Sequence, residues 1–244
     1  MSFHFHIHPH LLLVKMNPSF NHLMHQWTKS LLKVEKINLG KYGLSPMSTL
    51  RGIAIDHEFL RACYKFWDVD AHVFRLGAEC SELCPLFEEF CSIIGCNSNA
   101  PLVHRKIQIG YLRCFRELFG LTSAKVSEIA PGGQKAILSF LMDEFLEPIL
   151  EDPDQMMFRR RAFVFCLTAG FIFNRDPGFG DLELCPLVQQ MEQGHCIGAL
   201  VLAETIRSLD RAVLGFEEWT VSPVFLQVCF LNLYYFLLSF AFIY

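Results

Sequence analysis

Apolar residues recur at helical spacing along much of the chain, which predicts a mostly helical protein. Between Asp56 and Trp67 they lie three and four residues apart, so they share one face of a helix. Residues 71–77, AHVFRLG, alternate polar and apolar side chains instead, and this pattern predicts a short strand near residues 72–76. The apolar face of the helix consists of Phe59, Leu60, Cys63, Phe66 and Trp67.

A second helix is expected within CPLFEEFCSIIG, residues 84–95. Pro85 suits the first helical turn, where its missing N–H costs nothing, and Gly95 offers a C-terminal cap. Glu88 and Glu89 lie near the positive end of the helix dipole. The predicted buried stripe consists of Leu86, Phe87, Phe90, Ile93 and Ile94.

Three or four further helices are expected after residue 130, and the turn NRDPGFGD at 174–181 separates two of them. The sequence contains no fixed-period repeat and no strand–helix alternation that would build a parallel sheet. The fold class we predict is mainly α, a single irregular helical domain with a few short strands. The expected helical segments are residues 130–150, residues 152–173 with Asp152 or Asp154 as N-cap, residues 181–194 and residues 195–215.

The chain divides into three expected regions. Residues 1–45 form a flexible histidine-rich leader followed by a helix-capable stretch, and glycines and Ser45-Pro46 interrupt it. Residues 46–221 form the helical domain, and residues 222–244 form an apolar C-terminal segment. The first residues lack the basic start and the long apolar run of an export signal, so we expect no export.

The composition is rich in apolar residues, and the charge balance is slightly acidic. Of the 244 residues, 52% are hydrophobic and 19% are charged, and the mean hydropathy is +0.30. The formal net charge of −4 does not favour binding to nucleic-acid phosphates. Without export, the ten cysteines are expected to be free thiols, because the cytosol and the nucleus keep thiols reduced.

Four cysteines within residues 73–96 raise the question of a metal or redox site. Cys80, Cys84, Cys91 and Cys96 are spaced Cys-x3-Cys-x6-Cys-x4-Cys, whereas structural zinc sites usually contain two tight pairs of ligands. Cys91 also falls in the middle of a predicted helix, where a free cysteine behaves as a small hydrophobe. We therefore favour packing as the role of these thiols.

Alternating histidines near the start of the chain are a second candidate for metal binding. In an extended segment, His4, His6, His8 and His10 would all point to one side, where they could chelate zinc, copper or nickel. A disordered terminus without supporting hydrogen bonds is the alternative that we favour.

The remaining motifs do not predict an active site. APGGQKA at 130–136 is too short for a Walker A loop, and GFGD at 178–181 lacks the third glycine of a dinucleotide fingerprint. For the basic run Arg159–Arg161 we expect a solvated helix turn beside Glu151, Asp152 and Asp154 and not a phosphate site. The sequence therefore predicts no catalytic residue, no cofactor-binding residue, no metal ligand and no cofactor.

The last 24 residues, VSPVFLQVCFLNLYYFLLSFAFIY, carry no charge. Residues 224–244 reach the length of about 20 residues that a membrane-spanning helix needs, although Gln227, Asn232 and Ser239 weaken that prediction. A C-terminal membrane anchor and a core helix are both open alternatives. The abrupt change of composition suggests a third, in which the last sixteen residues are not native to the fold.

Residues 45–228 resemble the plant mobile domain, which is also labelled aminotransferase-like, and its retroelement-associated relatives. The resemblance is carried by an aromatic helix end, a short strand, an acidic helix that starts at Cys-Pro and ends in a glycine, and a later helix with a small-residue start. In this sequence these motifs are Phe66-Trp67, His72-Val73-Phe74, Cys84-Pro85-Leu86-Phe87-Glu88-Glu89, Ile93-Ile94-Gly95, and Ala203, Arg207, Leu209 and Leu214.

The resemblance implies a transposon-derived plant domain with a role in nuclear gene silencing or genome maintenance. It carries over no pyridoxal-phosphate lysine, because Lys106, Lys125 and Lys135 lie in no matching context. Members of this family usually continue past the long helix, so the chain resembles a truncated member.

These observations predict a non-enzymatic protein-interaction module of the nucleus with unidentified protein partners. One alternative is a membrane protein anchored through residues 224–244. The other is an enzyme without a recognisable motif, for which His72, Arg75 and Glu88 would have to converge in a concave pocket. For these three residues we favour solvated surface positions.

Overall fold

The computed structural model describes residues 18–50, 52–76, 81–105, 110–148, 151–216 and 219–231. Within these ranges there are eleven α-helices and five short strands, which confirms the prediction of a mainly α fold. The helices are α1 (Pro18–Ser30), α2 (Lys33–Leu39), α3 (Met47–Leu50), α4 (His57–Lys65), α5 (Phe87–Ile94), α6 (Tyr111–Phe119), α7 (Ser123–Ile129), α8 (Leu138–Phe145), α9 (Pro153–Leu167), α10 (Cys185–Glu192) and α11 (Gly198–Val213).

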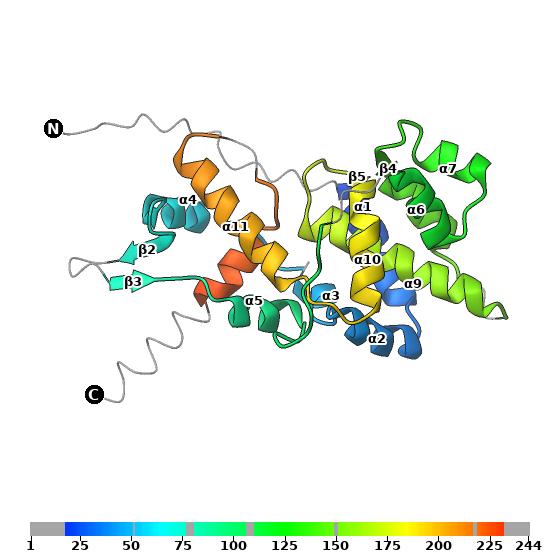
Figure 1. The fold of residues 1–244 in the computed structure, drawn as a ribbon, viewed down its shortest axis with the longest axis horizontal. Coiled ribbons are helices and arrows are strands. Elements are labelled where there is room, and N and C mark those ends of the chain that lie inside the picture. Colours follow the sequence, from blue (N-terminus) through cyan, green and yellow to red (C-terminus); the bar gives the residue numbers. More distant parts are fainter. Residues whose placement is uncertain are drawn as a thin grey trace.

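The helices gather at the two ends of an elongated molecule. Figure 1 shows α4, α5 and α11 at one end and α6 to α10 at the other, with α1 packed beside the second group. The described chain also has a helical segment at residues 224–231 and three shorter helical turns. The turns are the 3₁₀ turns η1 (Gly40–Tyr42) and η3 (Leu182–Leu184) and the π-helical turn η2 (Thr168–Ile172), which directly continues α9.

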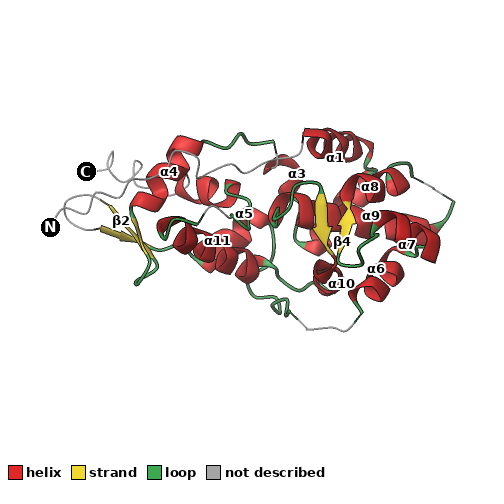
Figure 2. Ribbon diagram, turned by 90° about the horizontal axis from the view of Figure 1, so that it is seen from above, coloured by secondary structure: helices red, strands yellow, loops and turns green. Residues whose placement is uncertain are grey.

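Figure 2 shows two small antiparallel sheets, one at the end of the molecule beside α4 and the other among the helices of the opposite half. The first has the order β1-β2-β3 and pairs Trp67 with Phe74 and Phe74 with Leu83, so the strand predicted near 72–76 is confirmed. The second pairs β4 with β5. The strands are β1 (Trp67–Asp68), β2 (Val73–Leu76), β3 (Ser81–Leu83), β4 (Lys135–Ile137) and β5 (Phe179–Asp181).

Strand β4 occupies part of a segment that was predicted to be helical. The helix expected over residues 130–150 begins only at Leu138, because Lys135–Ile137 pair with Phe179–Asp181. Gly180 makes this pairing possible, since a Cβ atom there would lie 2.8 Å from Leu138 Cδ2 and 2.9 Å from Ala169 Cβ. The sheet therefore lies directly on the helices beneath it.

Most helix limits follow the sequence pattern. Asp56 caps α4 and Asp152 caps α9 through their side chains, and Gly95 ends α5 in the left-handed conformation. The start of α5 differs from the prediction, because the N-cap is Leu86, whose side chain is 50% exposed. Pro85 consequently lies before the helix, and Leu86 does not belong to its buried stripe.

The core consists of one large and one small cluster of buried side chains. The large cluster joins α1, α5, α6 and α8 to α10 and includes Trp27, whose ring meets Phe163 edge-on at 5.3 Å. The small cluster, which includes Leu60, Phe74 and Leu226, lies between α4, β2 and α11. Residues Phe20, Met24, Trp27 and Leu31 belong to the large cluster, although the sequence placed them in the leader region.

The basic run on α9 is not a solvated helix turn, so that prediction was wrong. Arg159 is 1% exposed, and its guanidinium donates to the carboxylate of Glu35 and to the carbonyl oxygen of Phe145. Arg161 Nη2 lies 2.9 Å from Glu192 Oε2. Arg159 is itself one of the buried residues of α9, so its guanidinium contacts partners from other elements instead of water.

The C-terminal apolar segment starts as part of the core. Residues 224–231 are helical, and Val224, Phe225 and Leu226 are fully buried. Gln227 accepts a hydrogen bond from the Asp56 N–H and donates one to the Ala54 carbonyl oxygen, both at 3.0 Å. Residues 232–244 lie outside the described part of the chain. In the described part, no helix has the length and apolar character needed to cross a membrane.

Candidate functional site around helix α11

Helix α11 contacts both core clusters and also contributes to the surface. Val201 is buried in the large cluster, whereas Leu209 and Ala212 are buried in the small one. Ala203 and Arg207, four residues apart, are exposed on the opposite side. A single helix therefore contributes to both core clusters and offers a solvent-facing strip.

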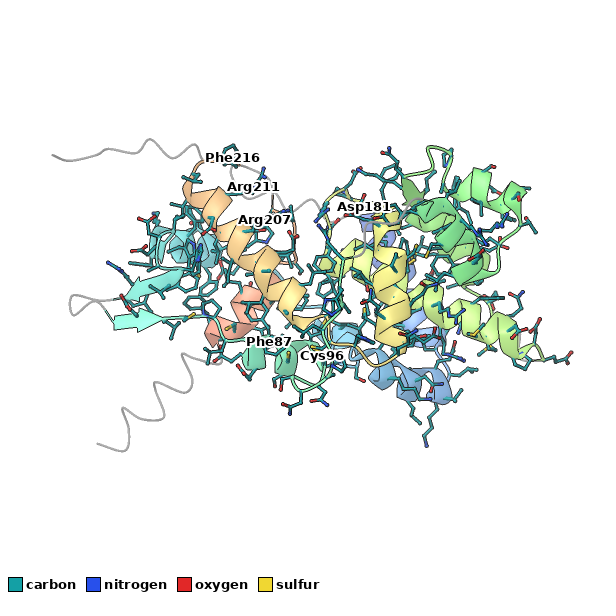
Figure 3. The ribbon with its side chains drawn as sticks, in the orientation of Figure 1. Phe87, Cys96, Asp181, Arg207, Arg211 and Phe216 are labelled. Atoms are coloured by element: carbon teal, nitrogen blue, oxygen red, sulfur yellow. The ribbon has the colours of Figure 1, made fainter. Side chains whose placement is uncertain are left out.

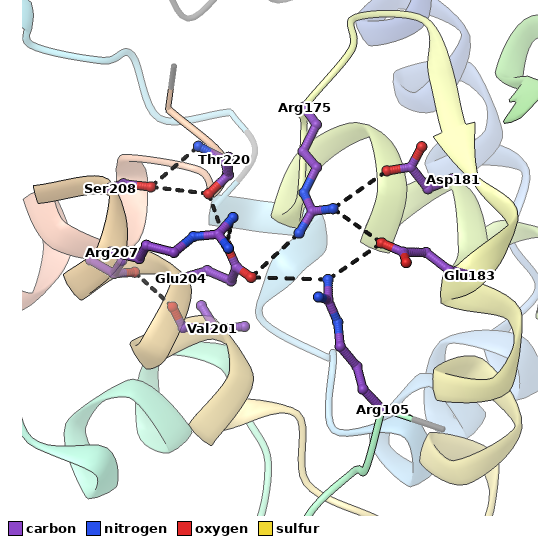
Figure 4. Close-up of polar contacts among 10 residues, drawn as sticks. Arg105, Arg175, Asp181, Glu183, Val201, Glu204, Arg207, Ser208 and Thr220 are labelled. Carbon is purple, nitrogen blue, oxygen red and sulfur yellow. Dashed lines mark hydrogen bonds and ion pairs between the residues drawn. The ribbon is translucent and has the colours of Figure 1, made fainter. Parts of the chain in front are cut away.

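A buried carboxylate lies at the middle of α11. Glu204 is 5% exposed, and its Oε2 atom accepts a hydrogen bond from Thr220 Oγ1 and lies 2.9 Å from Arg207 Nη2. Its Oε1 atom lies 3.3 Å from Arg175 Nη2 and 4.0 Å from Arg105 Nη2 (Figure 4). Three arginines from three separate segments thus surround one carboxylate.

Two of these arginines, Arg105 and Arg175, reach the other half of the molecule. Arg175 Nη1 lies 3.0 Å from Glu183 Oε1 and 3.7 Å from Asp181 Oδ2, and Arg105 Nη2 lies 3.4 Å from Glu183 Oε1. Figure 4 shows Arg105 and Arg175 between Glu204 on one side and Glu183 on the other. Three arginines face three carboxylates, so the formal charges balance, and we assign this network the structural role of joining α11 to β5 and η3.

An apolar groove follows the solvent-facing strip of α11. Its volume is about 270 Å³, and one wall comes from α11 while Phe87 of α5 and Leu102 form the other. Figure 3 shows Phe87 beside the first half of α11 and Arg207, Arg211 and Phe216 towards its far end. The residues that line the groove are Phe87, Leu102, Ala199, Leu202, Ala203 and Ile206.

Further exposed apolar side chains lie past the C-terminal end of α11. Leu214 is 65% exposed and Phe216 is 54% exposed, and the guanidinium carbon of Arg211 lies 5.2 Å from the Phe216 ring centroid. Such cation–π contacts leave the ring available on its other side. Apolar and basic groups therefore alternate along the outer surface of α11.

Two of the four clustered cysteines in the sequence meet a third one that is distant in the chain. The Sγ atom of Cys196 lies 3.5 Å from that of Cys91 and 2.9 Å from that of Cys96, and all three sulfurs lie within 4.8 Å of one another. Cys84 is exposed and lies elsewhere on the surface, and Cys80 lies outside the described residues. Sequence reasoning missed Cys196, because a hundred positions separate it from Cys96.

The other candidates from the sequence do not come together. His72 pairs with Asp210 at 3.2 Å, and Arg75 pairs with Asp68 at 3.1 Å, while Glu88 is exposed on α5. Two of the lysines form surface ion pairs, Lys125 with Glu144 and Lys135 with Asp176. Lys106 and the histidines His4, His6, His8 and His10 lie outside the described residues.

Comparisons with known proteins do not assign the chain to a family. No family model, no curated protein and no solved structure matches it.

Proposed function

We propose that the chain is a non-enzymatic protein-interaction module that binds an amphipathic helix of a partner protein in the groove between α5, Leu102 and α11. The observation that carries this proposal is the groove itself, whose lining side chains are all apolar. An amphipathic helix can lay its apolar face into an apolar groove of this kind.

The lining of the groove suits the apolar face of a helix. Ala199, Leu202, Ala203 and Ile206 are spaced three and four residues apart along one helix. A second helix with apolar residues at the same spacing can pack along such a strip.

The charges around the groove indicate the polar face of that partner. Arg207 follows the groove residue Ile206 in the sequence, and Arg105 lies three positions after Leu102. Both side chains are about half exposed, although they pair with Glu204. Acidic residues beside the apolar stripe of the partner would complement these guanidinium groups and would guide its approach. We therefore expect an acidic amphipathic helix.

The cellular context of the proposal comes from the resemblance to the plant mobile domain. That resemblance supports a transposon-derived protein that acts in the nucleus, in gene silencing or genome maintenance. The net charge of −4 supports contact with protein partners in preference to nucleic acid.

Site-specific photo-crosslinking in plant nuclei tests the proposal. A benzoylphenylalanine at position 203, which is exposed in the groove wall, should crosslink to one partner through an amphipathic acidic segment. The same probe at Phe140, an exposed position on α8, serves as the matched control and should not capture this partner. Ala203→Glu should weaken capture by about tenfold or more, equivalent to about 1.4 kcal/mol, because it places a carboxylate among the apolar lining.

The circular-dichroism spectrum of Ala203→Glu should match that of the unmodified chain, since the position is exposed. Equal capture from positions 203 and 140, or capture unaffected by Ala203→Glu, would contradict the proposal. Turnover of a small molecule without any specific partner would favour an enzyme instead.

A further inference from the structure

Cys91, Cys96 and Cys196 come from segments that fold separately and meet at one point. Cys91 lies in the last turns of α5, Cys96 follows the left-handed Gly95 that ends this helix, and Cys196 lies two residues before α11. Backbone hydrogen bonds hold each segment in place. The Cys96 N–H donates to the Cys91 carbonyl oxygen at 3.0 Å, and the Cys196 N–H donates to the Pro101 carbonyl oxygen at 2.7 Å.

Two glycines leave the space in which the sulfurs meet. A Cβ atom on Gly198 would lie 2.5 Å from Cys91 Sγ and within 3.4 Å of the other two sulfurs. A Cβ atom on Gly43 would lie 2.7 Å from the Cβ atom of Cys96. Any side chain at either position would displace the thiols, so the close approach of the three sulfurs depends on both glycines.

The first turn of α11 provides a backbone donor to the cluster. The Gly198 N–H donates to Cys196 Sγ at 3.3 Å, so the positive end of a sixteen-residue helix faces the sulfurs. An N–H donor of this kind stabilises a thiolate more than a thiol. The sequence Cys-Ile-Gly at this position is the local signal that sequence reasoning did not use.

We propose that Cys91, Cys96 and Cys196 bind one zinc ion, with water in the fourth coordination position on the side where Cys96 is partly exposed. Sulfur ligands about 2.3 Å from a tetrahedral zinc lie about 3.8 Å from one another. The Cys91–Cys196 separation of 3.5 Å is already close to this value. The Cys96–Cys196 pair, at 2.9 Å, opens by about 0.9 Å, through rotation of the half-buried Cys96 side chain.

Binding involves no redox step. Each thiol loses one proton to solvent, and each thiolate donates an electron pair to the cation, so three protons leave as one zinc ion enters. Burial, together with the proximity of the other sulfurs, raises the pKa of the Cys96 thiol to about 12 and raises the pKa of Cys91. Thiols with raised pKa values react slowly with oxidants, because the thiolate is the reactive species. A cation among the sulfurs would favour the thiolates and so lower these pKa values.

Cobalt substitution of the full chain tests the site. Co²⁺ added to the reduced, metal-free protein should give a thiolate-to-cobalt charge-transfer band and tetrahedral d–d bands. Their intensity should saturate at one Co²⁺ per chain. Added Zn²⁺ should displace the Co²⁺ and remove these bands. Cys96→Ser and Cys196→Ser should each weaken Co²⁺ binding by at least about tenfold, because loss of a direct ligand costs no less than loss of its outer partners. Cys84→Ser, an exposed cysteine outside the cluster, should leave the bands unchanged.

The histidines near the start of the chain need their own control. A variant with His4, His6, His8 and His10 replaced by alanine removes any imidazole site and should keep the charge-transfer band, which only sulfur ligands produce. Because Cys196 is buried, the fold of Cys196→Ser is compared with that of the unmodified chain by circular dichroism. If Cys196→Ser does not fold, the Co²⁺ binding of Cys96→Ser, at a partly exposed position, decides the test. The partner capture described above is measured separately, so failure of one proposal does not affect the other.

Three results would overturn the proposal. These are the absence of a charge-transfer band, a band that survives both Cys96→Ser and Cys196→Ser, and a Cys96–Cys196 disulfide in the protein as isolated from a reducing cytosol. The last result would show that the cluster is a redox pair.

Discussion

The buried side chain of Arg159 on α9 has a structural role, because it forms several polar contacts inside the protein. The guanidinium of Arg159 donates to Glu35, to the carbonyl oxygens of Phe145 and Leu146, and to Ser30 Oγ. Both charged residues are 1% exposed. Each ion therefore depends on the other for the interactions that water would otherwise provide.

Replacing Arg159 alone should strongly destabilise the protein. Arg159→Met leaves Glu35 buried without a charged partner and should lower the free energy of unfolding by about 3–5 kcal/mol, as measured by urea denaturation. Arg160→Met, one position along the same helix, should change it by less than about 1 kcal/mol. The double variant Glu35→Leu/Arg159→Met should recover much of the loss, because it removes both charges. Equal effects of Arg159→Met and Arg160→Met would contradict the structural role of the pair.

At the scale of elements, the start of α9 depends on one side chain. The Asp152 carboxylate accepts hydrogen bonds from the N–H groups of Asp154 and Gln155, at 2.9 Å and 3.1 Å. These N–H groups have no partner inside the helix. Pro153 follows directly at the first helical position, where its fixed backbone angle suits the helix.

Removing this cap should cost a moderate amount of stability. Asp152→Ala should lower the free energy of unfolding by about 0.5–2 kcal/mol, measured by thermal or urea denaturation. Glu151→Ala, an exposed neighbour that caps nothing in the structure, should stay within about 0.5 kcal/mol of the unmodified chain. A loss as large in Glu151→Ala would mean that charge near the helix start, and not the cap, stabilises α9.

The elements show which features a sequence pattern can predict. The helices α4, α9 and α11 and the end of α5 follow from apolar spacing, from aspartate caps and from Gly95, all of which act within a few residues. Strands β4 and β5 could not be predicted, because each has only three residues and pairs with a partner more than forty positions away. The contact between Cys96 and Cys196 escaped prediction for the same reason.

At the scale of the whole molecule, residues 224–231 complete the small core cluster. Leu226 is fully buried with Leu60 and Phe74, and the Phe230 ring meets the Phe74 ring edge-on at 4.5 Å. The uncharged sequence of residues 224–244 is compatible with a membrane helix and with a core helix. Gln227 favours the core helix, because its side-chain amide forms hydrogen bonds with backbone groups of residues 54 and 56. Only the folded chain brings these groups near Gln227.

Two leucines of this segment should therefore differ in their effect on stability. Leu226→Ala should lower the free energy of unfolding by about 2–5 kcal/mol, because it leaves a cavity in the small cluster. Leu231→Ala, at a position that is 43% exposed, should lower it by less than about 1 kcal/mol. Denaturation of both variants in the same buffer provides the comparison. Similar small losses in both would indicate that the segment does not pack where the structure places it.

The small cluster also sets an order of events during synthesis of the chain. Its first members, Leu60 and Phe74, leave the ribosome long before Leu209 and Leu226. At about 5–20 residues per second, roughly 8–30 seconds separate the translation of Phe74 from that of Leu226. During this interval the apolar faces of α4 and β2 lack the cover of residues 224–231, and until residues 198–213 are made they also lack the cover of α11. A chain whose synthesis ends before codon 226 therefore keeps these apolar faces exposed. Chaperones can bind such faces, and without chaperones they promote aggregation.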